Sequence, residues 1–91
     1  MNSWNVNRVY EGDDGWVEVL ILEDGRVVMS AHSNYEKYSK RLMLKIAKTF
    51  LTFSEVYTIL PYDYLVEFYN KHTHVELVDD KTRLYKIYGR R

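Results

Sequence analysis

Residues 16–32, WVEVLILEDGRVVMSAH, decide the fold because they hold two strands and the tight turn that joins them. Apolar side chains occupy both faces of the first strand, expected over residues 16–23, which predicts a central strand that is covered at least partly on each side. Asp24-Gly25 is the strongest short hairpin signal in the chain. We therefore expect residues 26–32 to return as a neighbouring strand.

The rest of the chain extends this hairpin into a larger sheet with two helices. A strand is expected before it, over residues 4–11, and Asp13 and Asp14 in the connecting turn are expected to face water. Beyond the long helix, the apolar patterns predict a strand, a short helix and two more strands, over residues 55–60, 62–71, 74–78 and 84–88. The order βββ-α-β-α-ββ predicts an α+β fold, with a mixed, mostly antiparallel sheet on which two helices pack.

The long helix is expected between these two groups of strands. Ser33, followed three residues later by Glu36, has the spacing of a capping box, which predicts a helix that begins at Ser33 and runs to about Phe53. An apolar seam at helical spacing identifies its core face: Tyr38, Leu42, Ile46, Phe50 and Phe53. A separate stripe on the same helix is basic: Lys37, Arg41, Lys45 and Lys48, flanked by Lys40.

Length and composition limit the classes of protein. With 91 residues, 46% of them hydrophobic, the chain is expected to form a single globular domain over residues 1–91. The longest aliphatic run, residues 19–22, is far shorter than the ~20 residues that span a bilayer, and the first residues lack a secretory pattern, so we expect no membrane partner. The absence of cysteine excludes disulfides, thiolate catalysis and cysteine-based zinc sites, and favours a reducing, cytoplasmic location.

Charge is strongly segregated along the chain, although the formal net charge is zero. Residues 1–24 hold one basic and six acidic side chains, and residues 25–48 hold six basic and one acidic, so their net charges are −5 and +5. Residues 49–80 again carry −5, and residues 81–91 carry +5. Strong local fields without a net charge suit a patterned partner better than a bulk polyanion.

The segment Tyr64–Lys71, YLVEFYNK, places a Phe-Tyr-x-Lys pattern on the second predicted helix. This pattern, together with the order of elements over about residues 16–88, resembles the core of the GNAT acetyltransferases. The resemblance implies a sheet of that family's form, acetyl-CoA as cofactor, and a role for Tyr69 as the acid that protonates the departing thiolate.

The cofactor motif of that family is missing here. A GNAT core has Arg/Gln-x-x-Gly-x-Gly/Ala before the long helix, and the backbone N–H groups of this motif grip the pyrophosphate. The corresponding stretch Ala31–Glu36, AHSNYE, has no glycine, and the expected capping box would put the Glu36 carboxylate where phosphate should bind. Thr73-His74 also replaces the usual Gly-Phe. We therefore expect a degenerate core of this kind, without a cofactor and without catalysis.

Three possible metal ligands occur at alternate positions, His72, His74 and Glu76. They would share one face if the stretch were extended. His72 is better placed at the end of the second helix, where an imidazolium group caps carbonyl oxygens. We therefore expect no metal site.

Three functions remain open. The first is a non-catalytic protein-interaction module that inhibits or adapts a larger macromolecular machine. Small, cysteine-free, aromatic-rich chains resemble phage-encoded host-takeover and anti-defence proteins, anti-CRISPR proteins among them, which would act in the host cytoplasm. Its expected contact residues are the basic stripe and exposed aromatic side chains: Lys37, Lys40, Arg41, Lys45, Lys48, Tyr35 and Trp16, with Trp4 as a further anchor.

The alternatives are a nucleic-acid-binding domain that uses the same stripe with the C-terminal Arg90 and Arg91, and a divergent acyltransferase. The basic stripe also has a simpler interpretation as an ordinary solvated helix face. The oligomeric state and the identity of any partner stay open.

Overall fold

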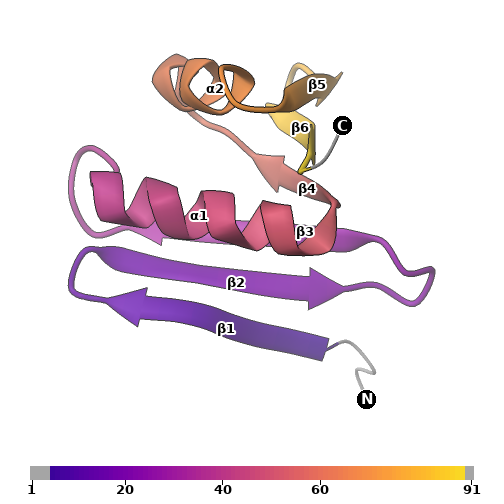
Figure 1. The fold of residues 1–91 in the computed structure, drawn as a ribbon, viewed down its shortest axis with the longest axis horizontal. Coiled ribbons are helices and arrows are strands. Elements are labelled where there is room, and N and C mark those ends of the chain that lie inside the picture. The colour runs from indigo at the N-terminus through magenta and orange to yellow at the C-terminus, as the bar shows by residue number, and fades with distance from the viewer. Residues whose placement is uncertain (1–4, 90–91) are drawn as a thin grey trace.

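The computed structural model describes residues 5–89, so Trp4, Arg90 and Arg91 lie outside the described part of the chain. Its elements are β1 (Asn5–Gly12), β2 (Gly15–Ile21), β3 (Val27–Ser33), α1 (Lys40–Phe53), β4 (Glu55–Ile59), α2 (Asp63–Asn70), β5 (His74–Asp79) and β6 (Leu84–Tyr88). The predicted order βββ-α-β-α-ββ and the α+β class are confirmed (Figure 1).

The strands form one six-stranded sheet in the order β1-β2-β3-β4-β6-β5. Only the pair β3–β4 is parallel, and its register holds just two residue pairs, Val28 with Tyr57 and Met29 with Thr58. The other four pairs are antiparallel, so the sheet is mixed and mostly antiparallel, as predicted. β2 is a central strand of the first half, and its Val17 and Val19 side chains are fully buried.

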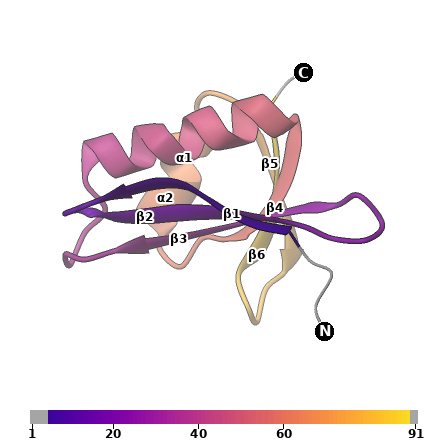
Figure 2. The ribbon, with the colours of Figure 1, turned by 90° about the horizontal axis from the view of Figure 1, so that it is seen from below.

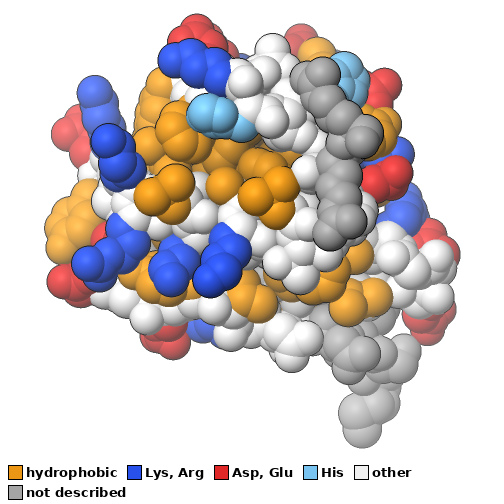
Figure 3. Space-filling model, viewed as in Figure 1, with side chains coloured by type: hydrophobic (Ala, Val, Ile, Leu, Met, Phe, Trp, Pro, Cys, Tyr) orange, Lys and Arg blue, Asp and Glu red, His pale blue; other side chains and the backbone are white. Residues whose placement is uncertain are grey.

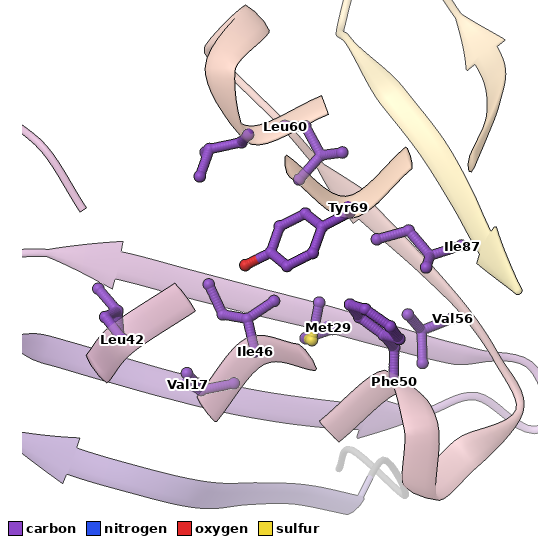
Figure 4. Close-up of a cluster of buried hydrophobic side chains, with 10 residues drawn as sticks. Val17, Met29, Leu42, Ile46, Phe50, Val56, Leu60, Tyr69 and Ile87 are labelled. Carbon is purple, nitrogen blue, oxygen red and sulfur yellow. The ribbon is translucent and has the colours of Figure 1, made fainter. Parts of the chain in front are cut away.

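Both helices pack on the same face of the sheet. α1 contributes the buried Leu42 and Phe50, and α2 contributes Leu65 and Tyr69, to one hydrophobic cluster with the strands. The rings of Phe50 and Tyr69 meet edge to face, with 5.3 Å between their centroids, which joins the two helices directly. Figure 4 shows Tyr69 reaching toward the α1 side chains, and Figure 2 shows α1 lying over β1–β3.

α1 begins at Lys40, so the predicted start at Ser33 is wrong. Ser33 is instead the last residue of β3, where it pairs with Gly15 of β2. Its hydroxyl group hydrogen-bonds to the backbone of Tyr35 and Lys37 in the following loop. Strand pairing and this local turn therefore override the capping-box pattern, because a serine oxygen that bonds its own loop cannot cap a helix.

The residue that caps α1 is Ser39. Its side chain accepts a hydrogen bond from the Leu42 N–H, at 3.0 Å, which is the usual N-cap contact. Tyr38, predicted as part of the helix seam, lies in the loop and still packs against the core, where its N–H donates to the Tyr64 hydroxyl at 2.9 Å. The prediction of the core-facing side of α1 was thus correct, but its first residue, Tyr38, lies before the helix.

Candidate partner-binding surface

The outward face of α1 brings four of the predicted contact residues together. Lys40, Arg41, Lys45 and Lys48 line one shallow groove together with Leu44. Their positions follow from helix geometry, because residues three, four and seven apart lie on the same side of a helix. Figure 3 shows this row of basic side chains over α1, next to a patch of apolar side chains. We call Lys40, Arg41, Leu44, Lys45, Lys48 and Leu51 the α1 face.

The other predicted contact residues lie elsewhere. Lys37 is not on the helix, because α1 starts after it; it lies with Tyr35 in the loop between β3 and α1, and both are exposed. Trp16 belongs to the sheet face opposite the helices, since neighbouring strand residues point to opposite faces and Val17 points into the core. There the Trp16 ring stacks on His32, with 5.7 Å between centroids, and Arg8 covers it at 4.6 Å.

The segregated charge blocks of the sequence interleave in space, except at α1. Arg83 pairs with Asp63 at 2.8 Å and Lys86 with Glu55 at 3.3 Å, so β6 and its neighbours neutralise each other. The remaining ion pairs lie within the first three strands and their turns, from Arg8 and Arg26. None of the ion pairs found within residues 5–89 involves a lysine or arginine of α1. Lys37, Lys71 and Lys81 form none either, but α1 is the element of the described chain on which several basic side chains without an ion pair lie together.

Two of the basic residues are oriented by the β1–β2 hairpin. The Lys45 ammonium group lies over the ring of Tyr10, 5.3 Å from its centroid, and the side chain is half-buried. The Arg41 charge is close enough to Asp14 to contribute to lowering the pKa of that carboxyl group. Lys40 and Lys48 are exposed. Lys45 and Arg41 thus link the α1 face to the β1–β2 hairpin.

Asp14 supports the start of α1, and the expectation that it faces water is wrong. Only 7% of Asp14 is exposed. Its carboxylate accepts hydrogen bonds from the Ser39 and Tyr10 hydroxyls, each at 2.7 Å, and these bonds lower its pKa. The negative charge also suits the positive end of the helix dipole. No local sequence pattern indicates this role, because the contact to Ser39 joins residues far apart in the chain.

The first turn of α1 runs against helix electrostatics. It contains no acidic residue, and Lys40 and Arg41 occupy its first two positions. Basic side chains are unfavourable near a helix N-terminus, where the dipole is positive. The Asp14 carboxylate, held at the N-cap by Ser39, supplies negative charge to this turn from the β1–β2 hairpin, and Arg41 contributes to lowering its pKa.

Tyr69 is a core residue in this structure. It is 1% exposed, and its hydroxyl group donates to the Met43 carbonyl oxygen of α1 at 3.0 Å. Burial raises the pKa of Tyr69 far above its ordinary value. A cavity of about 330 Å³ lies where β3 and β4 diverge, and its lining residues include Tyr38 and Thr58 but not Tyr69.

The start of α1 differs from the prediction that Ser33 and Glu36 cap it and occupy the place where a phosphate group would bind. Ser33 and Glu36 are not at the helix start, so they do not occupy it. Ser39 and the Asp14 carboxylate hold that position instead. A carboxylate beside the first N–H groups repels phosphate in the way that was expected of Glu36.

The histidines of the predicted metal triad pack against aromatic rings. His72 contacts Phe68, with 5.6 Å between centroids, and His74 contacts Tyr88 at 5.2 Å. Within residues 5–89, no group of three or more histidine or acidic side chains is close enough together to hold a metal ion. Over the same residues, no helix is both long enough and apolar enough to cross a membrane.

No family model, curated protein or solved structure matches the chain. The resemblance to the acetyltransferase core therefore stays a prediction.

Proposed function

We propose that the protein is a non-catalytic interaction module that binds a protein partner through the α1 face, as an inhibitor or adaptor of a larger macromolecular machine. The observation that carries the proposal is the unbalanced charge of α1. Arg8, Arg26, Arg83 and Lys86 form ion pairs, whereas the four basic residues of α1 form none within the described chain and lie together on one element. An acidic surface on a partner would supply the missing charges.

Apolar side chains in the same face favour a protein partner over nucleic acid. Leu44 is 55% exposed and Leu51 is 49% exposed, and both belong to the α1 face. A phosphate backbone offers leucine nothing to pack against, whereas protein interfaces combine an apolar centre with a charged rim. Exposed leucines among lysines are therefore better explained by a protein partner than by a polyanion.

Capture of a partner by the tagged protein tests the proposal. We expect a specific, saturable protein partner that is lost in the double variant Arg41→Glu with Lys48→Glu. The matched control is Lys81→Glu, an exposed lysine in the turn between β5 and β6, which should retain the partner. Circular dichroism would check that all variants fold alike. Retention of the partner by the double variant would show that another surface binds it.

Nucleic acid is the second candidate, because the row of basic side chains along α1 could follow a phosphate backbone. In that case single-stranded or duplex DNA should bind at ~50 mM salt, and the affinity should fall steeply as salt rises. The variant Leu44→Gln separates the two candidates. This variant should weaken the binding of a protein partner and leave the binding of nucleic acid unchanged.

An acyl ligand is the third candidate, favoured by the divergence of β3 and β4 around their cavity. A ligand that binds only the native state raises the melting temperature. We expect millimolar acetyl-CoA to leave the melting curve unchanged. A clear rise would support an acyltransferase or an acyl-carrier function in place of the interaction module.

A further inference from the structure

We propose that the partner presents an acidic amphipathic helix that packs lengthwise along the α1 face. This inference rests on the proposed function and names the kind of element that the face recognises. Leu44, Ala47 and Leu51 are spaced three and four residues apart, which is the spacing of the a and d positions in a helix-pairing seam. Leu44 and Leu51 point away from the core residues of the same helix, whereas Ala47 lies at the edge of the seam and also packs against the core.

The exposure of these three residues fits a seam that is ready for a partner. Leu44 and Leu51 are about half exposed, and Ala47 between them is half-buried and small. A small residue between two large ones lets a second helix approach closely, with its own side chains inserted on either side of the alanine. A pair of leucines seven residues apart gives this contact a direction along the helix axis.

Charge defines the partner further. Arg41 and Lys48 are also seven residues apart and lie along one side of the seam, with Lys45 beyond them. In paired helices, residues beside the seam meet the flanking residues of the other helix and select it by opposite charge. The matching helix therefore carries glutamate or aspartate beside its apolar positions.

A second α1 does not satisfy this requirement. α1 contains no acidic residue, so two α1 faces would bring their basic residues against one another. Like charges set opposite each other in helix pairs are destabilising. This repulsion keeps the α1 face from pairing with itself.

A defined peptide tests the inference on the intact protein. The probe is a lactam-stapled, fluorescein-labelled helix of three heptads with leucine at a and d and glutamate at e and g. The first control peptide has the same composition with the leucines distributed around the helix, and the second has lysine in place of glutamate. We expect saturable binding of the probe by fluorescence anisotropy at ~50 mM salt, and much weaker binding of both controls.

Matched variants locate the contact. Leu44→Gln with Leu51→Gln should lower the affinity for the probe by about tenfold or more, because the contact loses its central apolar pair. The control is Leu77→Gln on β5, a leucine of the same 49% exposure as Leu51, which should bind normally. Arg41→Glu with Lys48→Glu should abolish binding, and Lys81→Glu should not.

The outcomes separate this inference from the proposed function. Equal binding of the probe and of the peptide with dispersed leucines would overturn the helix inference, because any acidic chain would then suffice. Absence of probe binding, with a captured partner still lost on Arg41→Glu and Lys48→Glu, would overturn the inference and leave the proposed function standing. Preferential binding of duplex DNA to the α1 face, unaffected by Leu44→Gln, would overturn both.

Discussion

Asp14 is the residue that ties the β1–β2 turn to the start of α1. Its carboxylate accepts from Tyr10 on β1 and from Ser39 at the helix N-cap, and its carbonyl oxygen accepts from the Asn34 N–H at 3.0 Å. Three segments of the chain therefore depend on one side chain and its backbone. A carboxylate held in this way stabilises the fold only while it is ionised.

Replacement of Asp14 by Asn should lower the melting temperature at neutral pH, because both hydroxyl contacts lose their charged acceptor. The folded-state pKa of Asp14 is depressed, so its stabilisation is present above the ordinary carboxyl pKa of about 4 and is lost as the pH falls through the folded value. Thermal unfolding from pH 3 to pH 8 should show the two proteins converging at the acid end.

Asp13 is the matched control for this series, since it is the neighbouring residue and is exposed. Asp13→Asn should follow the wild-type curve throughout. A constant gap between Asp14→Asn and wild type down to pH 3 would mean that the contact does not depend on the carboxylate charge.

Tyr69→Phe should destabilise the fold by about 1 kcal/mol, since it removes the buried hydrogen bond from the Tyr69 hydroxyl to the Met43 carbonyl oxygen. Urea unfolding measures the change, and Tyr35→Phe, at a residue that is 60% exposed, should be neutral. No loss of stability in Tyr69→Phe would contradict the core role of this hydroxyl group.

At the level of elements, the strands were predictable and the start of α1 was not. Alternation and turn residues located all six strands to within about two residues, because these signals are local. The helix start depended on which of two serines caps it. Ser33 had the better sequence pattern, but pairing with Gly15 and contact of Ser39 with Asp14 are long-range events that no local pattern encodes.

Ser39→Ala should lower stability by about 1 kcal/mol, the usual cost of losing an N-cap. Glu36→Ala should have no measurable effect, because Glu36 is an exposed loop residue and not the third residue of the helix. Chemical unfolding of both variants decides between the two helix starts. A larger loss of stability in Glu36→Ala than in Ser39→Ala would favour the capping box of Ser33 and Glu36 as the helix start.

Lys40→Glu should stabilise the protein by about 0.5 kcal/mol, since it places a negative charge at the first position of α1. The same change should weaken the binding of the partner to the α1 face. Lys48→Glu lies farther from the helix start, so it should weaken the binding of the partner without raising the melting temperature. A fall in stability for Lys40→Glu would show that the dipole argument does not apply to this turn.

Over the whole molecule, the sequence predicted the kinds of element but not which charged residues would meet. The candidate contact residues of α1 came together because helical spacing alone places them. Trp16 did not join them, because the side of a sheet on which a strand residue lies depends on where the helices pack. The sequence could not predict that the basic residues of α1 form no ion pairs, because this depends on pairs between distant residues, such as Arg83 with Asp63 and Lys86 with Glu55.

The short β3–β4 pairing divides the molecule into two contiguous halves. Residues 5–54 supply β1, β2, β3 and α1, and residues 55–89 supply β4, β5, β6 and α2. Only two residue pairs link their strands, so side-chain packing such as Phe50 against Tyr69 carries much of the attachment. A chain cut after Ser54 should therefore reassemble when its two pieces are mixed.

This makes the protein suited to use as a split reporter, in which two tethered pieces report the proximity of whatever carries them. Mixing peptides 1–54 and 55–91 should regenerate native circular dichroism in a one-to-one complex, and Phe50→Ala in the first piece should weaken their association. Pieces that stayed unfolded together would show that the two backbone pairs between β3 and β4, and the unbroken link at Ser54, matter more than the shared interior.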